Sequence, residues 1–560
     1  MKQEQEAYLL QRKIEHASRV IRDPASRLSS ENMVGNGVKD NRNDQDEEEV
    51  LERTPNAKIM ELQRSHEKLY FEQSLPNPYR AIEDGSNGSV LEHQMRLLDM
   101  DVSSTLEKPQ CDSNDIKNAV LFSANVLEKC DGSLIPQYSL LGSANVKVEG
   151  TFDPAASRLF LNCNVPFSTF ICGVQGSGKS HTTSCIIENC LIPSPTLGVL
   201  QKPMSALLFQ WSENSSRLNF TPSEAAFLAS PSAQFFGHST VKSITVLASP
   251  SNIINLRAMY EKIPNVTVKP FLLRPKDLDI STILTLMSVD NTQSTPLYMA
   301  QITRILRDMA TKFEGPFNYA FFRRSVDNTD FDSKQREFLN QRLGLLESFL
   351  DMNNKTKTPA FQPGTITILD LTCPFVDANT ACVLFKIGLN MYLDSNPLVG
   401  KLLAVDEAHK YMTDTPASKA LTESLLTIIR QQRHFGIRII LSTQEPTISP
   451  RLIDLCSMVV IHRFTSPDWF HVLKRHIPIL VNQETNNTEA LELFRDILSL
   501  KTGQALCFAP SAVMQVGAEG SATPPSEDGE ILVRKLSEGM LKVRVRKRVT
   551  WDGGRSVVCL

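Results

Sequence analysis

The sequence lacks the features of a secreted, membrane-spanning or disulfide-framed protein. None of its 11 cysteines forms a CxxC pair, and an odd number does not suit a disulfide framework. No apolar run approaches the ~18 residues that a membrane-spanning helix needs. The opening residues are charged and contain no apolar signal-peptide core. We therefore expect free thiols, no membrane partner, and an intracellular location, cytoplasmic or nuclear.

The sequence also lacks an excess of charge of either sign. Its 59 lysines and arginines nearly balance 62 acidic residues, which gives a net charge of −3. Long-range attraction to nucleic acid or anionic lipid needs a clear positive excess, so the total charge favours neither partner. Hydrophobic residues make up 41% of the 560 residues and charged residues 22%, so the chain can form a large globular core.

Composition and periodicity divide the chain into four parts. Residues 1–115 have low hydrophobicity and an acidic, amide-rich stretch, and we expect them to be largely disordered. In residues 116–514, short apolar runs alternate with helical patterns, which predicts an α/β fold with a mostly parallel sheet flanked by helices. Within it, residues 278–352 have a helical period and predict an α-helical insertion. Residues 515–530 resemble a flexible linker, and residues 531–560 form a basic C-terminal tail.

The strongest motif is the segment ICGVQGSGKSHTTS, which contains the phosphate-loop pattern G-x-x-x-x-G-K-[ST] between a β-prone run and a helical run. Glycines allow the backbone to approach phosphates closely, and backbone N–H groups at the helix N-terminus then face the β- and γ-phosphates. Lys179 would place its positive charge across these phosphates, and the Ser180 hydroxyl would bind Mg²⁺. The candidate nucleotide-binding residues are Gly173, Val174, Gln175, Gly176, Ser177, Gly178, Lys179, Ser180 and His181.

A second motif is the buried-strand run LLAV, which ends in Asp406 and Glu407. Ligands of parallel α/β sheets bind beyond the carboxyl ends of the strands, so Asp406 is expected to reach the Mg²⁺ shell. Glu407 is expected to orient and deprotonate the attacking water. Asp370 ends another apolar run and is a rival metal ligand, but it lacks the adjacent glutamate that hydrolysis needs.

A helix and a strand follow this acidic pair. The strand IRIILST ends at Gln444, whose amide could bond the γ-phosphate or the attacking water if the strand lies between the other two. The apolar stripe of the preceding helix leaves Arg430 and Arg433 free to face outward. Each arginine could stabilise charge on a neighbouring subunit's nucleotide or could belong to a solvated helix face. Gln444 could also be only a turn residue before Pro446.

At these motifs the sequence resembles the HerA–FtsK superfamily of P-loop ATPases. The resemblance rests on GVQGSGKS, LLAVDEAH, the R-Q-Q-R-x-x-G spacing at 430–436 and ILSTQEP, and it covers roughly residues 160–510. It implies a RecA-like core with strand order 5-1-4-3-2, and ATP with Mg²⁺ as cofactors. It also implies Gln444 as a sensor and Arg433 or Arg430 as a finger acting in trans. Ring-shaped homo-oligomers, usually hexamers, that move DNA are implied as well. Similar proteins often carry an aspartate after the second strand, where this chain has Trp211 and Ser212.

The C-terminal tail contains a basic cluster that alternates with apolar residues. The cluster could contact phosphates or act as a nuclear-import signal. The alternation over Leu541–Val549 fits a one-sided edge strand equally well. The basic residues are Lys542, Arg544, Arg546, Lys547 and Arg548.

Three functions are compatible with these motifs. The first is an oligomeric ATPase motor that could act on DNA. The second is a nucleotide-gated signalling or scaffold module with slow or no turnover, which would capture partners through residues 1–115. The third is a P-loop kinase, which Glu407 disfavours because it suits the activation of water better than a pocket for a substrate hydroxyl.

Overall fold

The computed structural model describes residues 113–130, 133–144, 147–148, 151–213, 221–232, 239–287, 297–312, 317–352, 359, 361–446, 448–476, 487–516, 533–537 and 539–553. All of them belong to one compact unit, Pro109–Leu560. The region predicted to be disordered, 1–115, lies almost wholly outside the described residues, as does most of the predicted linker at 515–530. No helix of the described part is long and apolar enough to cross a membrane.

Five parallel strands form the centre of the main sheet, in the spatial order β14, β6, β13, β12 and β8. Numbered along the chain, this order is 5-1-4-3-2, which confirms the RecA-like arrangement. Their bounds are β6 (Ser168–Cys172), β8 (Ser205–Gln210), β12 (Lys401–Val405), β13 (Ile437–Thr443) and β14 (Met458–Ile461). Beyond β8 the sheet continues in parallel through β11 (Thr365–Asp370), β9 (Ser243–Ala248) and β10 (Val266–Pro270).

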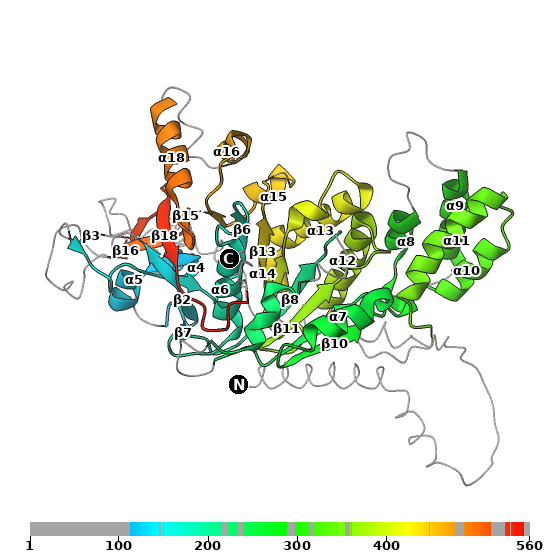
Figure 1. Ribbon diagram of the computed structural model, residues 1–560, viewed down its shortest axis with the longest axis horizontal. Coiled ribbons are helices and arrows are strands. Elements are labelled where there is room, and N and C mark those ends of the chain that lie inside the picture. The colour runs from blue at the N-terminus through cyan, green and yellow to red at the C-terminus, as the bar shows by residue number, and fades with distance from the viewer. Residues whose placement is uncertain are drawn as a thin grey trace, which may run out of the picture. The chain divides into compact units, whose positions relative to one another are not determined.

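Both faces of the central strands are buried, as their continuous apolar runs predict. Alternate residues of one strand enter two different hydrophobic clusters: Phe170 belongs to one and Ile171 to the other. The first cluster includes helices α12 (Ala378–Leu393) and α13 (Pro416–Arg430), and the second includes α6 (Lys179–Leu191). Figure 1 shows helices around the sheet. Because these strands are parallel, the carboxyl ends of β6, β12 and β13 lie at the same edge of the sheet as the phosphate loop.

The predicted α-helical insertion is present between β10 and β11. It consists of α8 (Ile280–Met287), α9 (Leu297–Lys312), α10 (Tyr319–Asp327) and α11 (Ser333–Ser348), the green helices at one end of the sheet in Figure 1. Asn318 and Asp332 cap the last two helices by accepting hydrogen bonds from backbone N–H groups of the first turn. Helix α8 packs against α12 and α13, so the insertion continues the core of one sheet face.

On the other side of β14 the strands pair antiparallel, except β1 with β16, which pair in parallel, and the sheet joins the two ends of the described chain. The order there is β15 (Gln504–Phe508), β18 (Leu541–Val545), β2 (Tyr138–Ala144), β5 (Arg158–Asn162), β1 (Leu121–Ser123), β16 (Val513–Val516) and β17 (Val533–Lys535). The expected strand in the basic tail therefore exists, but the edge position is wrong. Strand β18 pairs with β15 on one side and with β2 on the other, so its backbone groups are bonded on both sides.

The remaining elements are short or peripheral. They are α4 (Ser113–Asn118), α5 (Ala124–Lys129), β3 (Lys147–Val148), β4 (Thr151–Phe152), β7 (Gly198–Val199), η2 (Glu224–Ala229), η3 (Pro250–Asn252), α7 (Ile253–Tyr260), η4 (Pro275–Asp277), η5 (Ala408–Lys410), α14 (Gln432–Phe435), α15 (Pro450–Asp454), α16 (Pro467–Lys474) and α18 (Asn487–Ser499).

The segment after β18 crosses helix α6 and forms a buried charge pair with it, which we call the C-terminal clasp (residues 546–552). The guanidinium of Arg546 donates to Glu188 Oε2 at 2.6 Å, to Asn189 Oδ1 at 2.8 Å and to the carbonyl oxygens of Cys185 and Leu140. The Glu188 side chain is 0% exposed, and its other oxygen accepts from the backbone and hydroxyl of Thr550. The guanidinium of Arg546 therefore makes its hydrogen bonds within the protein and is not free to contact nucleic acid.

Removing one partner of this pair should destabilise the protein strongly. Arg546→Ala removes the closer of two cations from a buried carboxylate and leaves only Arg548, whose Nε lies 3.9 Å from Glu188 Oε1. Breaking a buried ion pair costs about 3–5 kcal/mol of unfolding free energy, and Arg548 should keep the loss near the lower end. Urea denaturation of the purified chain measures the loss. The matched control is Arg451→Ala, whose ion pair with Glu423 has both side chains more than half exposed, and which should lose at most about 1 kcal/mol. Equal losses in the two variants would contradict the clasp.

Candidate nucleotide-binding site

The phosphate loop joins strand β6 to helix α6 and depends on its glycines. Gly173 and Gly178 have φ angles of 153° and 115°, a region that side chains with a Cβ rarely adopt. A Cβ on Gly173 would lie 2.7 Å from the Cβ of His462. On Gly178 it would lie 3.1 Å from the backbone nitrogen of Gly503. The loop therefore leaves no room for larger residues at these positions. Helix α6 begins directly after the loop, and the N-terminus of a helix is a favourable position for phosphate because its backbone N–H groups are unpaired.

Lys179, the first residue of α6, carries a nearly buried positive charge. Its side chain is 4% exposed, and its ammonium donates to the Val174 carbonyl oxygen at 3.2 Å. Burial lowers the pKa of Lys179 below its ordinary value, and the carboxylates of Glu407 and Asp406 oppose that change. The lysine is bonded only weakly within its own loop, while the strand-end carboxylates act on it electrostatically. A triphosphate with a divalent cation would fit this arrangement.

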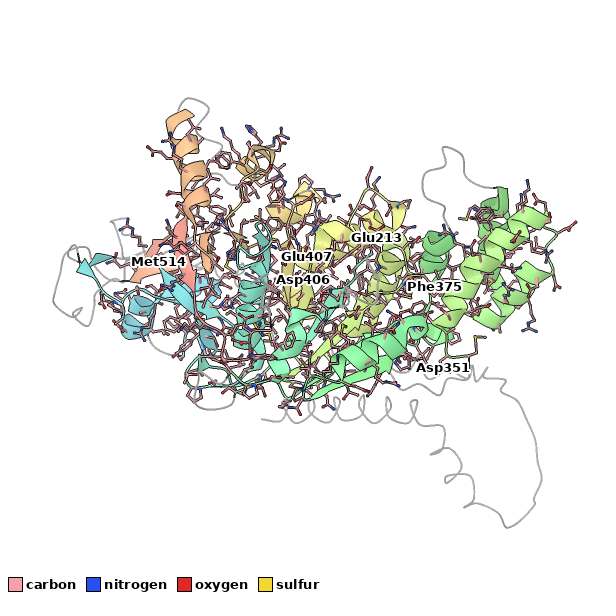
Figure 2. All side chains as sticks on the ribbon, viewed as in Figure 1. Glu213, Asp351, Phe375, Asp406, Glu407 and Met514 are labelled. Carbon is pink, nitrogen blue, oxygen red and sulfur yellow. The ribbon has the colours of Figure 1, made fainter. Side chains whose placement is uncertain are left out.

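Asp406 and Glu407, labelled in Figure 2, follow the end of β12 and have different environments. Burial, and then the charge of Glu407, raise the pKa of Asp406 to about 6. Glu407 has φ 48° and ψ 42°, the left-handed conformation that non-glycine residues seldom adopt. Such a backbone costs on the order of 1–3 kcal/mol and is concentrated at functional sites. The strain aims the Glu407 side chain across the strand ends toward β13.

Gln444, which follows β13, contacts Glu407 directly. Its side-chain amide donates to Glu407 Oε1 at 3.0 Å. Glu407 Oε2 is buried and has no hydrogen-bond partner among the described residues. A buried carboxylate oxygen without a donor is unusual, because such groups normally find a partner. The structure therefore brings two residues singled out from the sequence into one hydrogen bond and leaves one oxygen able to accept a proton from a water molecule.

The sequence analysis did not single out His409 as a contributor to this site. Its Nδ1 lies 3.4 Å from Glu407 Oε2 and accepts a long hydrogen bond, 3.4 Å, from the Gln444 backbone N–H. The same Nδ1 also lies 3.3 Å from the Thr443 hydroxyl, and a lone pair on Nδ1 is needed to accept from the Gln444 backbone, which matches a neutral imidazole protonated at Nε2. Burial lowers the pKa of His409, against the opposing effect of Glu407, in agreement with that neutral state. The signal was present in the sequence, since His409 ends the motif DEAH.

Asp370, the rival metal ligand, is held elsewhere. Its Oδ2 accepts from the Tyr260 hydroxyl at 2.7 Å and its Oδ1 from the Thr372 backbone N–H at 3.0 Å. Its strand, β11, is separated from β6 by β8, β12 and β13. These bonds occupy the carboxylate and leave Asp406 as the better placed aspartate.

The two arginines lie at the opposite end of β13 from Gln444. Arg430 ends α13 and Arg433 lies in α14, just before β13 begins, and both are exposed. Arg433 makes a long hydrogen bond, 3.5 Å, to Asn118 Oδ1. The seven residues of β13 span about 20 Å at the usual ~3.3 Å per residue. Neither arginine can therefore reach the phosphate loop of its own chain.

His181 was predicted to lie in the nucleotide site, but its side chain contacts the C-terminal clasp. Its Nε2 donates to the Arg546 carbonyl oxygen at 2.8 Å, and its Nδ1 lies 3.8 Å from Asp552. Only its backbone remains available to a phosphate. The side chain instead fastens the first turn of α6 to the chain's C-terminal segment.

His462 supports the loop from behind and was also missed by the sequence analysis. Its Nδ1–H donates to the Gln504 carbonyl oxygen at 3.0 Å, so its Nε2 accepts from the Thr182 hydroxyl at 2.9 Å. Burial lowers the pKa of His462 to about 4. The imidazole is therefore neutral at pH 7 and acts as a rigid spacer between β14 and the loop.

This neutral histidine predicts a loss of stability in acid. Between pH 6.5 and 4 the unfolded chain binds a proton at position 462 that the folded chain excludes, so the unfolding free energy falls as the pH falls. The loss reaches about 3 kcal/mol at pH 4, at ~1.4 kcal/mol per unit. Urea denaturation at pH 7, 6, 5 and 4 of the natural protein and of His462→Gln measures it. The glutamine variant should lose that much less over this range, and parallel pH profiles would contradict the assignment.

No protein-family model and no curated protein matches the sequence. Among solved structures, VirB4 of Thermoanaerobacter pseudethanolicus is similar over 73% of this chain and 97% of its own, at 10% identity and a TM-score of 0.42. The plasmid coupling protein TrwB in complex with ADP and Mg²⁺ is similar over 73% and 90%, at 11% identity and a TM-score of 0.37. The genome packaging NTPase B204 from Sulfolobus turreted icosahedral virus 2, in complex with AMPPCP, is similar over 61% and 92%, at 10% identity and a TM-score of 0.25.

These identities and scores are low, so the fold assignment rests on the strand order and the loop geometry. The order β14, β6, β13, β12 and β8, with a glycine loop after β6, defines the architecture. The chain has the fold of a RecA-like P-loop NTPase and is similar in its motifs to the HerA–FtsK superfamily.

Proposed function

We propose that this protein binds ATP together with Mg²⁺ and hydrolyses the γ-phosphate. The observation that carries the proposal is the hydrogen bond between Gln444 and Glu407 at the strand ends, beside the buried charge of Lys179. The ADP, AMPPCP and Mg²⁺ named for the similar solved structures support an adenine nucleotide with a divalent cation.

Different groups of the phosphate loop would bind different parts of the nucleotide. Backbone N–H groups of the loop other than those of Val174 and Ser177, which donate to carbonyl oxygens of the chain, would hold the phosphate oxygens. Lys179 would exchange its weak bond to Val174 for the β- and γ-phosphates. Ser180 and Asp406 would hold Mg²⁺, which offsets phosphate charge and orients the γ-phosphate when bound. The burial of Lys179 strengthens its attraction for phosphate because water screens the charge less.

Glu407 acts as the base. Oε1 is occupied by Gln444, and Oε2 accepts a proton from a water molecule as the water oxygen bonds to the γ-phosphorus. The bond between that phosphorus and the bridging oxygen breaks, and ADP carries away the electron pair. Gln444 contacts the base directly. If its amide moved toward a bound γ-phosphate, the hydrogen bond to Glu407 Oε1 would break, so the environment of the base would depend on the bound nucleotide. Water is the acceptor in this scheme, which distinguishes it from a kinase.

Glu407→Gln should abolish turnover and keep nucleotide binding, because the amide preserves shape but cannot take a proton. Loss of a general base lowers the rate by about 10²–10⁴-fold. Phosphate release and the binding of a fluorescent ATP analogue measure the two properties separately. Lys179→Ala is the reference variant and should lose binding itself. Normal turnover in Glu407→Gln would refute the assignment of the base.

We further propose that the active form is a ring-shaped homo-oligomer, such as a hexamer, in which Arg433 or Arg430 acts on the neighbouring subunit's nucleotide. The support is their position, about 20 Å from the Gln444 end of β13 at ~3.3 Å per residue. Action on DNA is the corresponding proposal for the substrate, and the names of the coupling and packaging proteins are consistent with it. A nucleotide-gated module without DNA is the alternative, and a monomer whose turnover is not stimulated by double-stranded DNA would favour it.

Mixing two inactive variants tests action in trans. Arg433→Ala should lower turnover by about 10³-fold or more and leave nucleotide binding intact. Mixed with Glu407→Gln, it should regain activity, because some interfaces then combine an intact Glu407 with an intact Arg433. Arg257→Ala, an exposed arginine on α7, is the control and should change nothing. If the mixture stays inactive while Arg430→Ala behaves as predicted for Arg433→Ala, the finger is Arg430. If neither arginine variant loses turnover, the proposal fails.

A further inference from the structure

We propose that a cavity between η2 and α7 is the docking site for residues 554–560 of this same chain, whose apolar side chains fill it. These residues have the sequence GRSVVCL and lie outside the described part of the chain. The inference goes beyond the nucleotide chemistry, because no lining residue of the cavity belongs to the phosphate loop or to the strand ends beside it.

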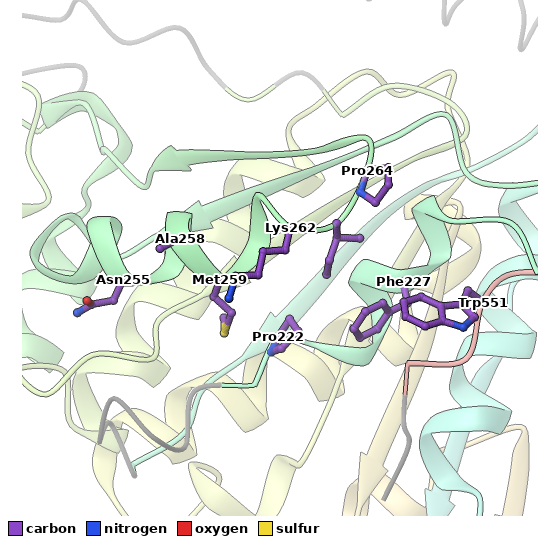
Figure 3. A pocket seen from close by; sticks show the side chains of 9 residues that line it. Pro222, Phe227, Asn255, Ala258, Met259, Lys262, Pro264 and Trp551 are labelled. Atoms are coloured by element: carbon purple, nitrogen blue, oxygen red, sulfur yellow. The ribbon is translucent and has the colours of Figure 1, made fainter. Parts of the chain in front are cut away.

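The cavity has a volume of about 790 Å³ and lies on the sheet face that α6 covers (Figure 3). One wall is α7, where Asn255, Ala258 and Met259 recur at the spacing of one helix side. The other wall includes Phe227 of η2 and Trp551 of the C-terminal clasp. Most of the lining is apolar, so the cavity suits an apolar occupant.

Hydrogen bonds hold the walls of the cavity in place. The Ser223 backbone N–H, directly before η2, donates to the hydroxyl of Tyr260, the last residue of α7, at 3.0 Å. That hydroxyl donates to Asp370 Oδ2 at 2.7 Å, and all three residues are buried. At the other end of η2, the Trp551 backbone N–H donates to the Ser230 carbonyl oxygen at 2.8 Å. The site is therefore formed before anything binds to it.

The described chain ends at the rim of this cavity. Phe227 meets Trp551 edge to face, with ring centres 5.3 Å apart. Two residues further on, Gly553 lies against the same phenylalanine, since a Cβ on it would come within 2.2 Å of two ring carbons. Residue 554 therefore starts beside the cavity. At ~3.3 Å per residue, the segment 554–560 reaches up to about 23 Å, which brings the cavity within range.

The composition of residues 554–560 matches the cavity. The segment ends in four consecutive apolar residues, Val557 to Leu560, and its one charged residue, Arg555, comes before them. Lys262 is an exposed cation in the lining, so Arg555 is expected to stay in water at the rim. Trp551 is 46% exposed, and an apolar segment over it would remove that surface from water.

Tethering favours this segment over a separate protein as the occupant. A short segment joined to the rim of a site has an effective concentration on the order of millimolar there. Contacts too weak to hold a free peptide therefore suffice to keep a tethered one in place.

Disulfide trapping in the full chain tests the docking. Ala258→Cys places a thiol on the cavity wall, and Cys559 supplies the other thiol. A disulfide forms only where two Cβ atoms approach to about 4 Å, so mild oxidation should join 258 to 559, as mass spectrometry of the digested protein detects. Arg257→Cys, an exposed position on another side of α7, is the matched control and should give at least about tenfold less of this disulfide.

The reactivity of Cys559 gives a second measurement that needs no engineered thiol. In the natural protein, iodoacetamide should modify Cys559 at least about tenfold more slowly than in Val557→Ser/Val558→Ser, which loses apolar side chains that enter the cavity. Ala258→Trp fills the cavity from its wall and should expose Cys559 to the same extent.

Three results would overturn the proposal. The first is a Cys559 that reacts as fast in the natural protein as in the serine variant. The second is protection of Cys559 that Ala258→Trp leaves unchanged, because the segment then docks elsewhere. The third is a 258–559 disulfide between two chains, seen as a covalent dimer on a non-reducing gel, which would assign the cavity to a second copy.

Discussion

The parallel pairing of β12 with β13 is the constraint on which the site depends. Their register places Val405 opposite Leu441, so the residues that follow, Asp406 and Glu407 on one strand and Gln444 on the other, leave the same edge of the sheet. Strand β6 lies on the other side of β13 and brings the phosphate loop to that edge. A shift of one residue would turn every side chain to the opposite face. The contact between Glu407 and Gln444 therefore depends on this register.

The charges gathered at this edge explain why a metal belongs there. Burial lowers the pKa of Lys179, whereas the charges of Glu407, Asp406 and Glu224 act to raise it. Without a further cation, a triphosphate would meet Asp406, Glu407 and Glu224 together. Asp406 already takes up protons more readily than usual, because its charge is buried next to that of Glu407. A divalent cation offsets this repulsion, so nucleotide and metal are expected to bind as one unit.

Much of this arrangement could be predicted from the sequence because its signals are local. The glycine loop, the apolar runs and the strand-end residues Asp406, Glu407 and Gln444 each occupy a few consecutive positions. The internal place of β18 and the burial of Arg546 could not be predicted. Each depends on contacts between distant segments, such as Arg546 with Glu188, which no periodicity records. A basic alternating segment has the same pattern whether its arginines face solvent or a buried glutamate.

A single chain cannot place Arg430 or Arg433 beside its own phosphate loop. Charge that develops on the γ-phosphate during hydrolysis is stabilised best by a cation placed at that end of the strands. Within one chain Lys179 lies there, whereas Arg433 lies beyond the opposite end of β13. The distance is set by the length of a buried strand and cannot be closed by rotating a side chain. Under the proposed mechanism an isolated subunit would have only Lys179, Glu407 and Gln444 for hydrolysis, and any contribution from an arginine of the α13–α14 region would have to come from a second copy.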